Sequence, residues 1–197
     1  MGKNRIDIMV DIETLGIELD STIIQVGAIA FNIDSGEYLE FFNEYVNIKK
    51  NKELKVSGST LQWWLKTNAN LLKEIITKQD QSSDTVSKKL YDWIVELKNK
   101  YEVYLWGNGI AFDNSMIKTA IKNIGLEYPI KYTNDRDVRT ILELASIKSG
   151  KTEKEIKSSI KLDGIAHDAF YDCKFQIAYV SKCWKYLTKG DETKCVQ

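Results

Sequence analysis

Apolar and acidic residues alternate near the start of the chain. Every second residue from Ile6 to Ile12 is branched and apolar, and the positions between them lead to Asp11 and Glu13. An alternation of period two predicts a β-strand, on which residues two apart share a face at roughly 6.6 Å. Buried together, the two carboxylates would need a strong partner such as a divalent cation. On an exposed edge strand they would only be solvated, and this pattern alone leaves both interpretations open.

Three further stretches have strand character. A β-branched run over 22–32, a turn signal at 34–36 and a returning strand over 38–48 predict an antiparallel meander with the first strand. The almost wholly apolar segment 103–106 is typical of a strand in the interior of a sheet. The glycine turn at 107–109 follows it, but the full G-x-G-x-x-G fingerprint is absent, so a dinucleotide site is only weakly indicated.

Apolar spacings of three and four residues predict helices near 61–65, over 84–101, after 109, over 141–145 and from about 168 to 187. The first of these places Leu61, Trp64 and Leu65 on a core-facing side. Trp63 falls off that side, so its ring either stacks on a base or packs under a loop.

Two lysine-rich segments interrupt these elements. We expect 49–55 to be a solvated loop and 148–161 to be a mobile excursion whose charge could hold a nucleic-acid backbone.

Composition narrows the class of protein. The 197 residues, 43% of them hydrophobic, predict one domain with a core over about 5–188 and a flexible tail over 189–197. Lysine plus arginine and aspartate plus glutamate balance at 28 each, so no global positive field indicates a nucleic-acid partner. Three cysteines without C-x-x-C spacing indicate reduced thiols and make a zinc site improbable. With no signal-peptide or membrane-spanning pattern, we expect a cytoplasmic protein without a membrane partner.

The remaining polar candidates have ordinary explanations when taken one at a time. Asp113, near a helix start, is explained by capping. His167 is the only histidine, and such a residue before a helix is more often structural. Residues five apart on a helix point about 140° apart. We therefore place His167 in the loop, Asp168 as a cap and Asp172 on the helix, an arrangement that can aim His167 and Asp172 at one point.

The arginines are equally ambiguous on their own. Two of the chain's three arginines, Arg136 and Arg139, lie in a turn after the single proline. Structural ion pairing is the default interpretation of this pair, and contact with phosphate is the alternative.

Considered together, these positions resemble a known family. Asp11-x-Glu13, Asp113 and His167-x-x-x-x-Asp172 are similar, in order and role, to the three motifs of the DEDDh class of 3′→5′ exonucleases. The resemblance spans roughly Ile6 to Lys185 and is stronger still to phage-type exonuclease A, which has counterparts of Ser59-Thr60-x-x-Trp63-Trp64, Arg136-Asp137-x-Arg139-Thr140 and Leu162-Asp163-Gly164. The sister DEDDy class has a tyrosine four residues before the last acid, where this chain has Asp168.

The resemblance implies an α/β fold of the ribonuclease H-like type, a mixed sheet with antiparallel N-terminal strands and helices on both faces. It also implies two Mg²⁺ or Mn²⁺ ions, about 3.5–4 Å apart, that clamp the scissile phosphate. Asp11 would bridge both ions, and Glu13, Asp113 and Asp172 would complete their shells. His167 would take the proton from the attacking water. Without metal, the converging carboxylates would raise one another's pKa.

The implied substrate is single-stranded nucleic acid, degraded from its 3′ end to 5′-mononucleotides. DNA is favoured over RNA, and the compartment would be the host cytoplasm if a phage encodes the chain. Substrate contacts are expected from the backbone at Thr14 and Leu15, with Leu15 wedged beside the base, and from Trp63, Asn108, Phe112 and Arg139. An inactive binding module on the same fold would lack an acid or the histidine, and all five are present. A small-nucleotide or phosphoprotein hydrolase is a weaker alternative.

Overall fold

The central feature of the computed structural model, which describes residues 3–189, is a five-stranded mixed sheet. Its strands lie in the order β3-β2-β1-β4-β5. They comprise β1 (Arg5–Thr14), β2 (Ile23–Phe31), β3 (Tyr38–Tyr45), β4 (Glu102–Gly107) and β5 (Asp135–Asp137). The first three form the predicted antiparallel meander, whereas β4 runs parallel to both β1 and β5. The predicted interior position of β4 is therefore confirmed.

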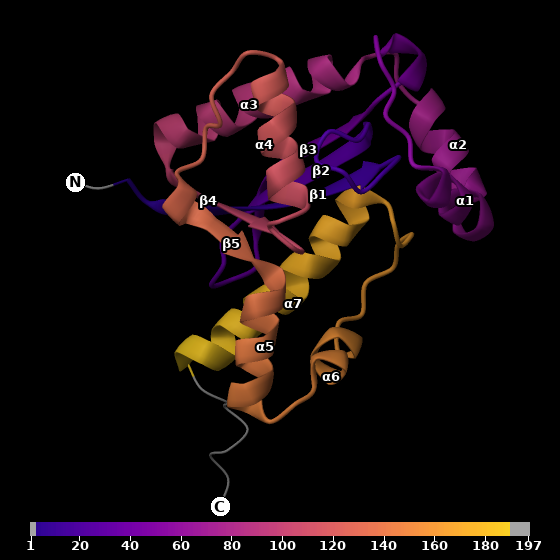
Figure 1. Ribbon diagram of the computed structural model, residues 1–197. Coiled ribbons are helices and arrows are strands. Elements are labelled where there is room, and N and C mark those ends of the chain that lie inside the picture. Colours follow the sequence, from indigo (N-terminus) through magenta and orange to yellow (C-terminus); the bar gives the residue numbers. More distant parts are fainter. Residues whose placement is uncertain (1–2, 190–197) are drawn as a thin grey trace, which may run out of the picture.

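Helices cover both faces of the sheet, as expected (Figure 1). The helical elements are η1 (Ile48–Lys50), α1 (Gly58–Thr67), α2 (Ala69–Thr77), α3 (Ser83–Lys100), α4 (Asp113–Asn123), η2 (Tyr132–Asn134), α5 (Val138–Ser149), α6 (Glu153–Ser158) and α7 (Ala169–Lys189). One face packs against α3 and α4, and the opposite face packs against α5 and α7. A third, smaller cluster joins α1 and α2 to the start of β2 and the end of β3. No helix in residues 3–189 is long and apolar enough to cross a membrane.

Strand β1 lies between β2 and β4, and its two faces are buried by helices on both sides of the sheet. Its apolar positions, such as Ile8 and Val10, join the α3/α4 core, while Met9 on the other face joins the α5/α7 core. Asp7 on that second face is buried and satisfied by an ion pair with Arg5 and a 2.7 Å hydrogen bond from Trp106 Nε1. The exposed-edge interpretation of Asp11 and Glu13 is therefore wrong.

The first helical prediction needs a correction. Trp64 is buried, but Leu61 and Leu65 remain 37% and 59% exposed. A hydrogen bond from Trp64 Nε1 to the carbonyl of Thr14, 2.9 Å long, fixes this helix at the end of β1. The core contacts expected of the two leucines are made instead by buried residues of α2. The apolar spacing does not predict this helix.

Two later segments are more ordered than predicted. Residues 135–137 form the edge strand β5, and Arg139 lies in the first turn of α5 rather than in a loop. The predicted mobile excursion at 148–161 contains α6, which begins with a capping box formed by Thr152 and Glu155. Ile156 from α6 is 1% exposed in the α5/α7 core. That prediction of mobility was therefore wrong, because one buried side chain and a capped terminus hold the segment.

The cysteine and tail predictions are tested only in part. Cys173 and Cys183 are free and buried, as expected of reduced thiols. Cys195 and the predicted tail, apart from Lys189 at the end of α7, lie outside the described residues.

Candidate active site

The predicted acids meet in a pocket of about 330 Å³ at the C-terminal end of β1. The pocket is lined by Asp11, Ile12, Glu13, Asn108, Phe112, Asp113, Lys157, His167, Asp172, Phe175, Gln176 and Tyr179. All four predicted metal ligands and the only histidine are among them. Segments far apart in the sequence, from β1 to α7, thus contribute to one acidic site.

Two elements place the acids on the sheet side of the pocket. Strand β1 presents Asp11 and Glu13 on one face, and Glu13 is 8% exposed. Asp113 is the first residue of α4 and is 4% exposed. Its carboxylate accepts backbone hydrogen bonds from Ile12, Asn108 and its own residue. Simple helix capping does not describe Asp113, because its carboxylate is also buried beside Asp11.

The third element, α7, starts in close contact with β2. A Cβ at Gly27 would lie 2.5 Å from the carbonyl carbon of Ala169, so this approach requires glycine. Gln25 is fully buried beside it and accepts a 3.2 Å hydrogen bond from the Ala169 N–H. Asp168 accepts from the N–H groups of Phe170 and Tyr171, which confirms its predicted role as a cap. These contacts fix the first turn of α7, from which Asp172 projects.

Burial raises the pKa of every acid in the pocket. The pKa of Asp11 lies well above its usual range because of burial and because Asp113 and Asp172 are close. Burial, with Asp11 next in importance, raises the pKa of Glu13 to about 10. The pKa of Asp113 rises to about 7 through burial, although backbone hydrogen bonds and Arg139 oppose the rise. Burial also raises the pKa of Asp172.

These shifts favour the binding of positive charge at the site. Four carboxylates that are this close must hold either protons or cations. Carboxylate oxygens are the hard donors that Mg²⁺ and Mn²⁺ prefer, and neither cysteine of the described chain lines the pocket. The donor set therefore fits a divalent metal. Ligand atoms of Glu13, His167 and Asp172 also lie within 4.8 Å of one another, close enough to share an ion.

Gln176 is a residue that the sequence interpretation missed. Its Nε2 donates a 2.8 Å hydrogen bond to Asp11 Oδ1, and its side chain is buried. Its Oε1 has no hydrogen-bond partner among the described atoms. The available signal was its position four residues after Asp172, because residues with this spacing lie on the same helix face.

His167 occupies a strained position in the loop before α7. It has a φ of 67°, a left-handed conformation that is uncommon for a residue other than glycine. Its N–H donates to Asp172 Oδ2 at 3.1 Å. Its ring meets the edge of Trp63 at a centroid distance of 4.8 Å, with an interplanar angle of 89°. Trp63 therefore packs on the histidine and remains 39% exposed, so its stacking on a base stays a prediction.

Two contacts attach this loop to α7. Tyr171 Oη donates a 2.9 Å hydrogen bond to the carbonyl of Leu162. Gly164 lies against the Tyr171 ring so closely that an added Cβ would be 1.8 Å from Cδ2. The Leu162-Asp163-Gly164 segment thus holds the path of the chain toward His167.

The predicted substrate residues divide into two groups. Asn108 and Phe112 line the pocket. Thr14 and Leu15 are 7% and 4% exposed and do not line it. The Leu15 side chain packs in the core with Trp64, so the predicted wedge beside a base is not placed at the site.

The two arginines have separate roles. Arg139 lies beside the glycine turn, where a Cβ at Gly109 would be 3.3 Å from its Cζ. Arg136 donates to the carbonyls of Thr133 and Asp135 and stacks on Tyr104. No ion pair of either arginine is found within residues 3–189. In place of the expected ion pairs, Arg136 contacts two carbonyls and the Tyr104 ring, and Arg139 lies near the charge of Asp113.

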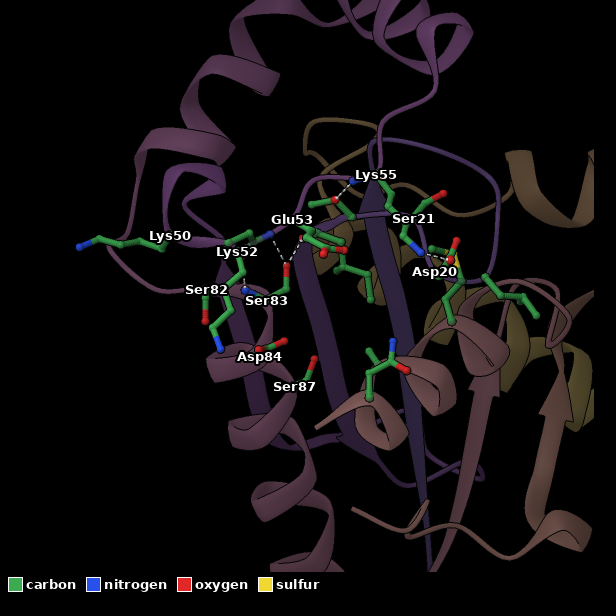
Figure 2. A pocket seen from close by; sticks show the side chains of 17 residues that line it. Asp20, Ser21, Lys50, Lys52, Glu53, Lys55, Ser82, Ser83, Asp84 and Ser87 are labelled. Carbon is green, nitrogen blue, oxygen red and sulfur yellow. Dashed lines mark hydrogen bonds and ion pairs between the residues drawn. The ribbon is translucent and has the colours of Figure 1, made fainter. Parts of the chain in front are cut away.

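A second cavity of about 370 Å³ lies beside the start of α3 (Figure 2). It is lined by Lys50, Lys52 and Lys55 from the predicted lysine-rich loop together with Ser82 and Ser83. Lys50 and Lys55 form ion pairs with Asp80 and Asp20. The loop prediction for 49–55 holds apart from the short turn η1, and the cavity contains none of the four predicted metal ligands.

The mixed sheet, the four convergent carboxylates and the neighbouring histidine define a DEDDh 3′→5′ exonuclease, a class whose members depend on divalent metal. The chain belongs to the family of 3′-5′ exoribonuclease Rv2179c-like domains, whose model matches residues 6–184. It is also 27% identical to an exodeoxyribonuclease of Enterobacteria phage T4, over 91% of this chain and 89% of that protein.

Solved structures confirm the predicted ribonuclease H-like fold. The nuclease domain of 3′hExo, a DEDDh family member bound to rAMP, aligns with a TM-score of 0.63 at 19% identity, covering 94% of this chain and 92% of that one. A zinc-bound complex of E. coli ExoI with single-stranded DNA aligns with a TM-score of 0.67 at 15% identity. That alignment covers 95% of this chain but 42% of ExoI.

Proposed function

We propose that the protein removes 5′-mononucleotides, one at a time, from the 3′ end of single-stranded DNA. The observation that carries this proposal is the convergence of Asp11, Glu13, Asp113 and Asp172 in one pocket with the only histidine of the chain. Similarity to the phage T4 exodeoxyribonuclease over nine-tenths of the chain favours DNA. The balanced net charge fits a groove in which positive charge is supplied locally.

The four acids would hold two Mg²⁺ or Mn²⁺ ions, which supply a reactive water at neutral pH and offset the charge on the phosphate. Asp11 is central to this set because the negative charges of Asp113 and Asp172 both raise the pKa of its carboxylate. Gln176 keeps one Asp11 oxygen in a fixed direction through its 2.8 Å hydrogen bond.

His167 is the proposed general base. Its imidazole accepts the proton as water attacks phosphorus, a role that typically contributes about 10²–10⁴ in rate. The backbone bond to Asp172 and the edge of Trp63 fix where this ring lies. Because His167 belongs to the loop before α7, its placement depends on these two contacts and on how the loop is held.

The terminal nucleotide would enter past Asn108 and Phe112, which line the pocket beside Asp113. The half-exposed Trp63 ring borders the other side through its contact with His167. Arg139 adds positive charge near the glycine turn, where it favours the charged form of Asp113. These residues would orient the strand, while the acids determine where it is cut.

RNA is the second candidate substrate, and the description of the matching family model as an exoribonuclease domain favours it. A protein distinguishes RNA from DNA by contacts to the 2′-hydroxyl. The Asn108 side chain, which lines the pocket, would be a polar group that could make or lack such a contact.

Matched DNA and RNA oligonucleotides of one sequence, labelled at the 5′ end, test this proposal. We expect Mg²⁺ or Mn²⁺ to support progressive shortening from the 3′ end, faster on DNA, and a chelator to stop it. Faster shortening of RNA would transfer the assignment to the second candidate. Intact substrate under all of these conditions would refute both.

A further inference from the structure

Helix α6 brings a lysine to the edge of the acidic pocket. Lys157 lines the same cavity as Asp11, Glu13 and His167, and it is the single lysine or arginine among the described residues that line this cavity. The side chain is partly buried, and its Nζ lies 5.6 Å from the centroid of the Tyr179 ring. The segment that was expected to be mobile therefore supplies a cation to the site.

Lys157 is not neutralised by a neighbouring acid. Within residues 3–189 no carboxylate lies within ion-pair distance of its Nζ. Its described partner is instead the face of an aromatic ring. Because an ammonium group is strongly hydrated, placing it at a pocket wall without an anion leaves its charge available to a ligand.

The point on α7 that Lys157 contacts indicates which phosphate of the substrate it would bind. Tyr179, beneath its Nζ, is seven residues after Asp172, which corresponds to about 10 Å along a helix axis. Lys157 is therefore displaced along α7 from Asp172, one of the acids proposed to surround the scissile phosphate. The terminal nucleotide carries no other phosphodiester, so any second phosphate that enters the pocket belongs to the strand on the 5′ side of the cut.

We propose that Lys157 binds the phosphate on the 5′ side of the scissile bond. This inference depends on the proposed exonuclease function and adds a specific substrate contact to it. The contact would favour strands of more than two nucleotides and would guide the chain after each cut.

The structure of α6 supports a fixed role for this lysine. Ile156, the residue before Lys157, is buried in the core, and the Thr152–Glu155 capping box holds the start of the helix. After the helix, Ser159 Oγ accepts a 2.7 Å hydrogen bond from Lys182 Nζ on α7. Anchors on both sides of Lys157 limit how far its backbone can move.

The test compares two thymidine substrates, a decanucleotide and a 5′-hydroxyl dinucleotide whose only phosphate is the scissile one. We expect Lys157→Ala to lower kcat/KM on the decanucleotide by about tenfold, as is typical of a hydrogen bond between charged groups. On the dinucleotide, kcat/KM should be unchanged. Lys157→Arg should retain most of the activity. Lys154→Ala, which removes an exposed lysine of the same helix outside the pocket, should behave as wild type.

A neutral methylphosphonate at the linkage next to the scissile one sharpens the test. It should slow the wild type to the level of Lys157→Ala and should not slow that variant further, because the two changes remove one contact. An equal loss on both substrates, no loss on the decanucleotide, or an equal loss in Lys154→Ala would overturn the inference.

Binding separates failure of this inference from failure of the proposed function. With Ca²⁺ in place of Mg²⁺, the slope of log affinity against log salt for the labelled decanucleotide should decrease in magnitude by about 0.7 in Lys157→Ala, the value for one phosphate contact on a single strand. A wild type that leaves every substrate intact refutes the proposed function. An unchanged slope refutes the lysine contact, whether or not the wild type cleaves.

Discussion

The two walls of the acidic pocket are built in different ways. The acidic wall consists of β1 and the first turns of α4 and α7, and its acids are held by buried elements of the core. The loop wall, residues 159–168, carries His167 and is held by the Tyr171 contact with Leu162, the backbone bond to Asp172 and the edge of Trp63. The proposed metal binding therefore depends on the fold itself, whereas the proposed proton transfer depends on a few local contacts.

This difference has an energetic side. Burial and mutual repulsion disfavour the charged forms of the acids in the acidic wall, so a bound proton or cation should stabilise it. The loop wall instead contains a residue in a left-handed conformation, which is a strain of the backbone that no cation changes. Changes in the acidic wall should thus affect metal binding and stability, and changes in the loop wall should affect turnover.

The largest effect is expected from Asp11→Asn. It removes the carboxylate whose pKa is raised by both Asp113 and Asp172, at the centre of the proposed metal site. Activity should therefore fall by about 10³ or more. The chelated protein should melt at a higher temperature than the wild type, because one buried charge is gone. Calorimetric titration with Mn²⁺ and a melting curve measure both effects. Asp92→Asn, on the exposed face of α3, is the control; wild-type metal binding in Asp11→Asn would contradict the assignment.

A smaller effect, confined to turnover, is expected from His167→Ala. The rate should fall by about 10²–10⁴, the usual contribution of a general base. The stabilisation by Mn²⁺ should remain close to that of the wild type, because four carboxylates are left in place. Single-turnover cleavage and melting curves separate the two quantities. Normal turnover would exclude His167 from the mechanism, and a loss of metal binding would place it in the acidic wall.

Gln176→Leu should weaken the acidic wall without removing a ligand. The change deletes the 2.8 Å hydrogen bond to Asp11 while roughly preserving side-chain volume. Residues that orient metal ligands typically contribute about 10–100-fold in metal affinity. Isothermal titration with Mn²⁺ measures this loss, and excess metal should recover most of the turnover. Gln62→Leu, on the exposed side of α1, provides the matched control; equal affinities in both variants would show that Gln176 has only a packing role.

The smallest effect concerns stability and pH. The pKa of Glu13 is raised from 4.5 to about 10, so folding favours its protonated form. Stability from this group is fully present below about pH 4.5 and is lost as the pH rises toward 10. The melting temperature of the chelated protein should fall over this range, and the stabilisation by Mg²⁺ should grow, because metal competes with protons. A metal effect that is independent of pH would contradict the shifted acids.

The sequence predicted the acidic wall better than the loop wall. Alternation along β1 placed Asp11 and Glu13 on one face, and the order of the acids indicated the chemistry. It did not show that Gln176 touches Asp11, because that contact joins positions 165 residues apart and arises from how α7 packs on β1. The place of Lys157 in the pocket could not be predicted for a related reason. Its segment is polar, and nothing in the sequence indicated that Ile156 would anchor the segment in the core.

The apolar spacing in α1 predicted the wrong core residues, because packing there is determined by contacts with the end of the sheet. Leu61 and Leu65 share a helical face with Trp64 but stay exposed, because the carbonyl of Thr14 orients the tryptophan and α2 fills the remaining space. Leu15 was assigned to substrate by resemblance alone, and its side chain belongs to this same cluster.

The most direct test of the central claim is the polarity and metal dependence of cleavage in one assay. A single strand carrying a 5′ label is compared with the same strand blocked at its 3′ end, using wild type and Asp11→Asn in Mg²⁺. The predicted result is a ladder that shortens from the 3′ end, with 5′-mononucleotides as the product, and no cleavage of the blocked strand or by the variant. Cleavage of the blocked strand, or undiminished cleavage by Asp11→Asn, would contradict a 3′→5′ exonuclease that works through this carboxylate pocket.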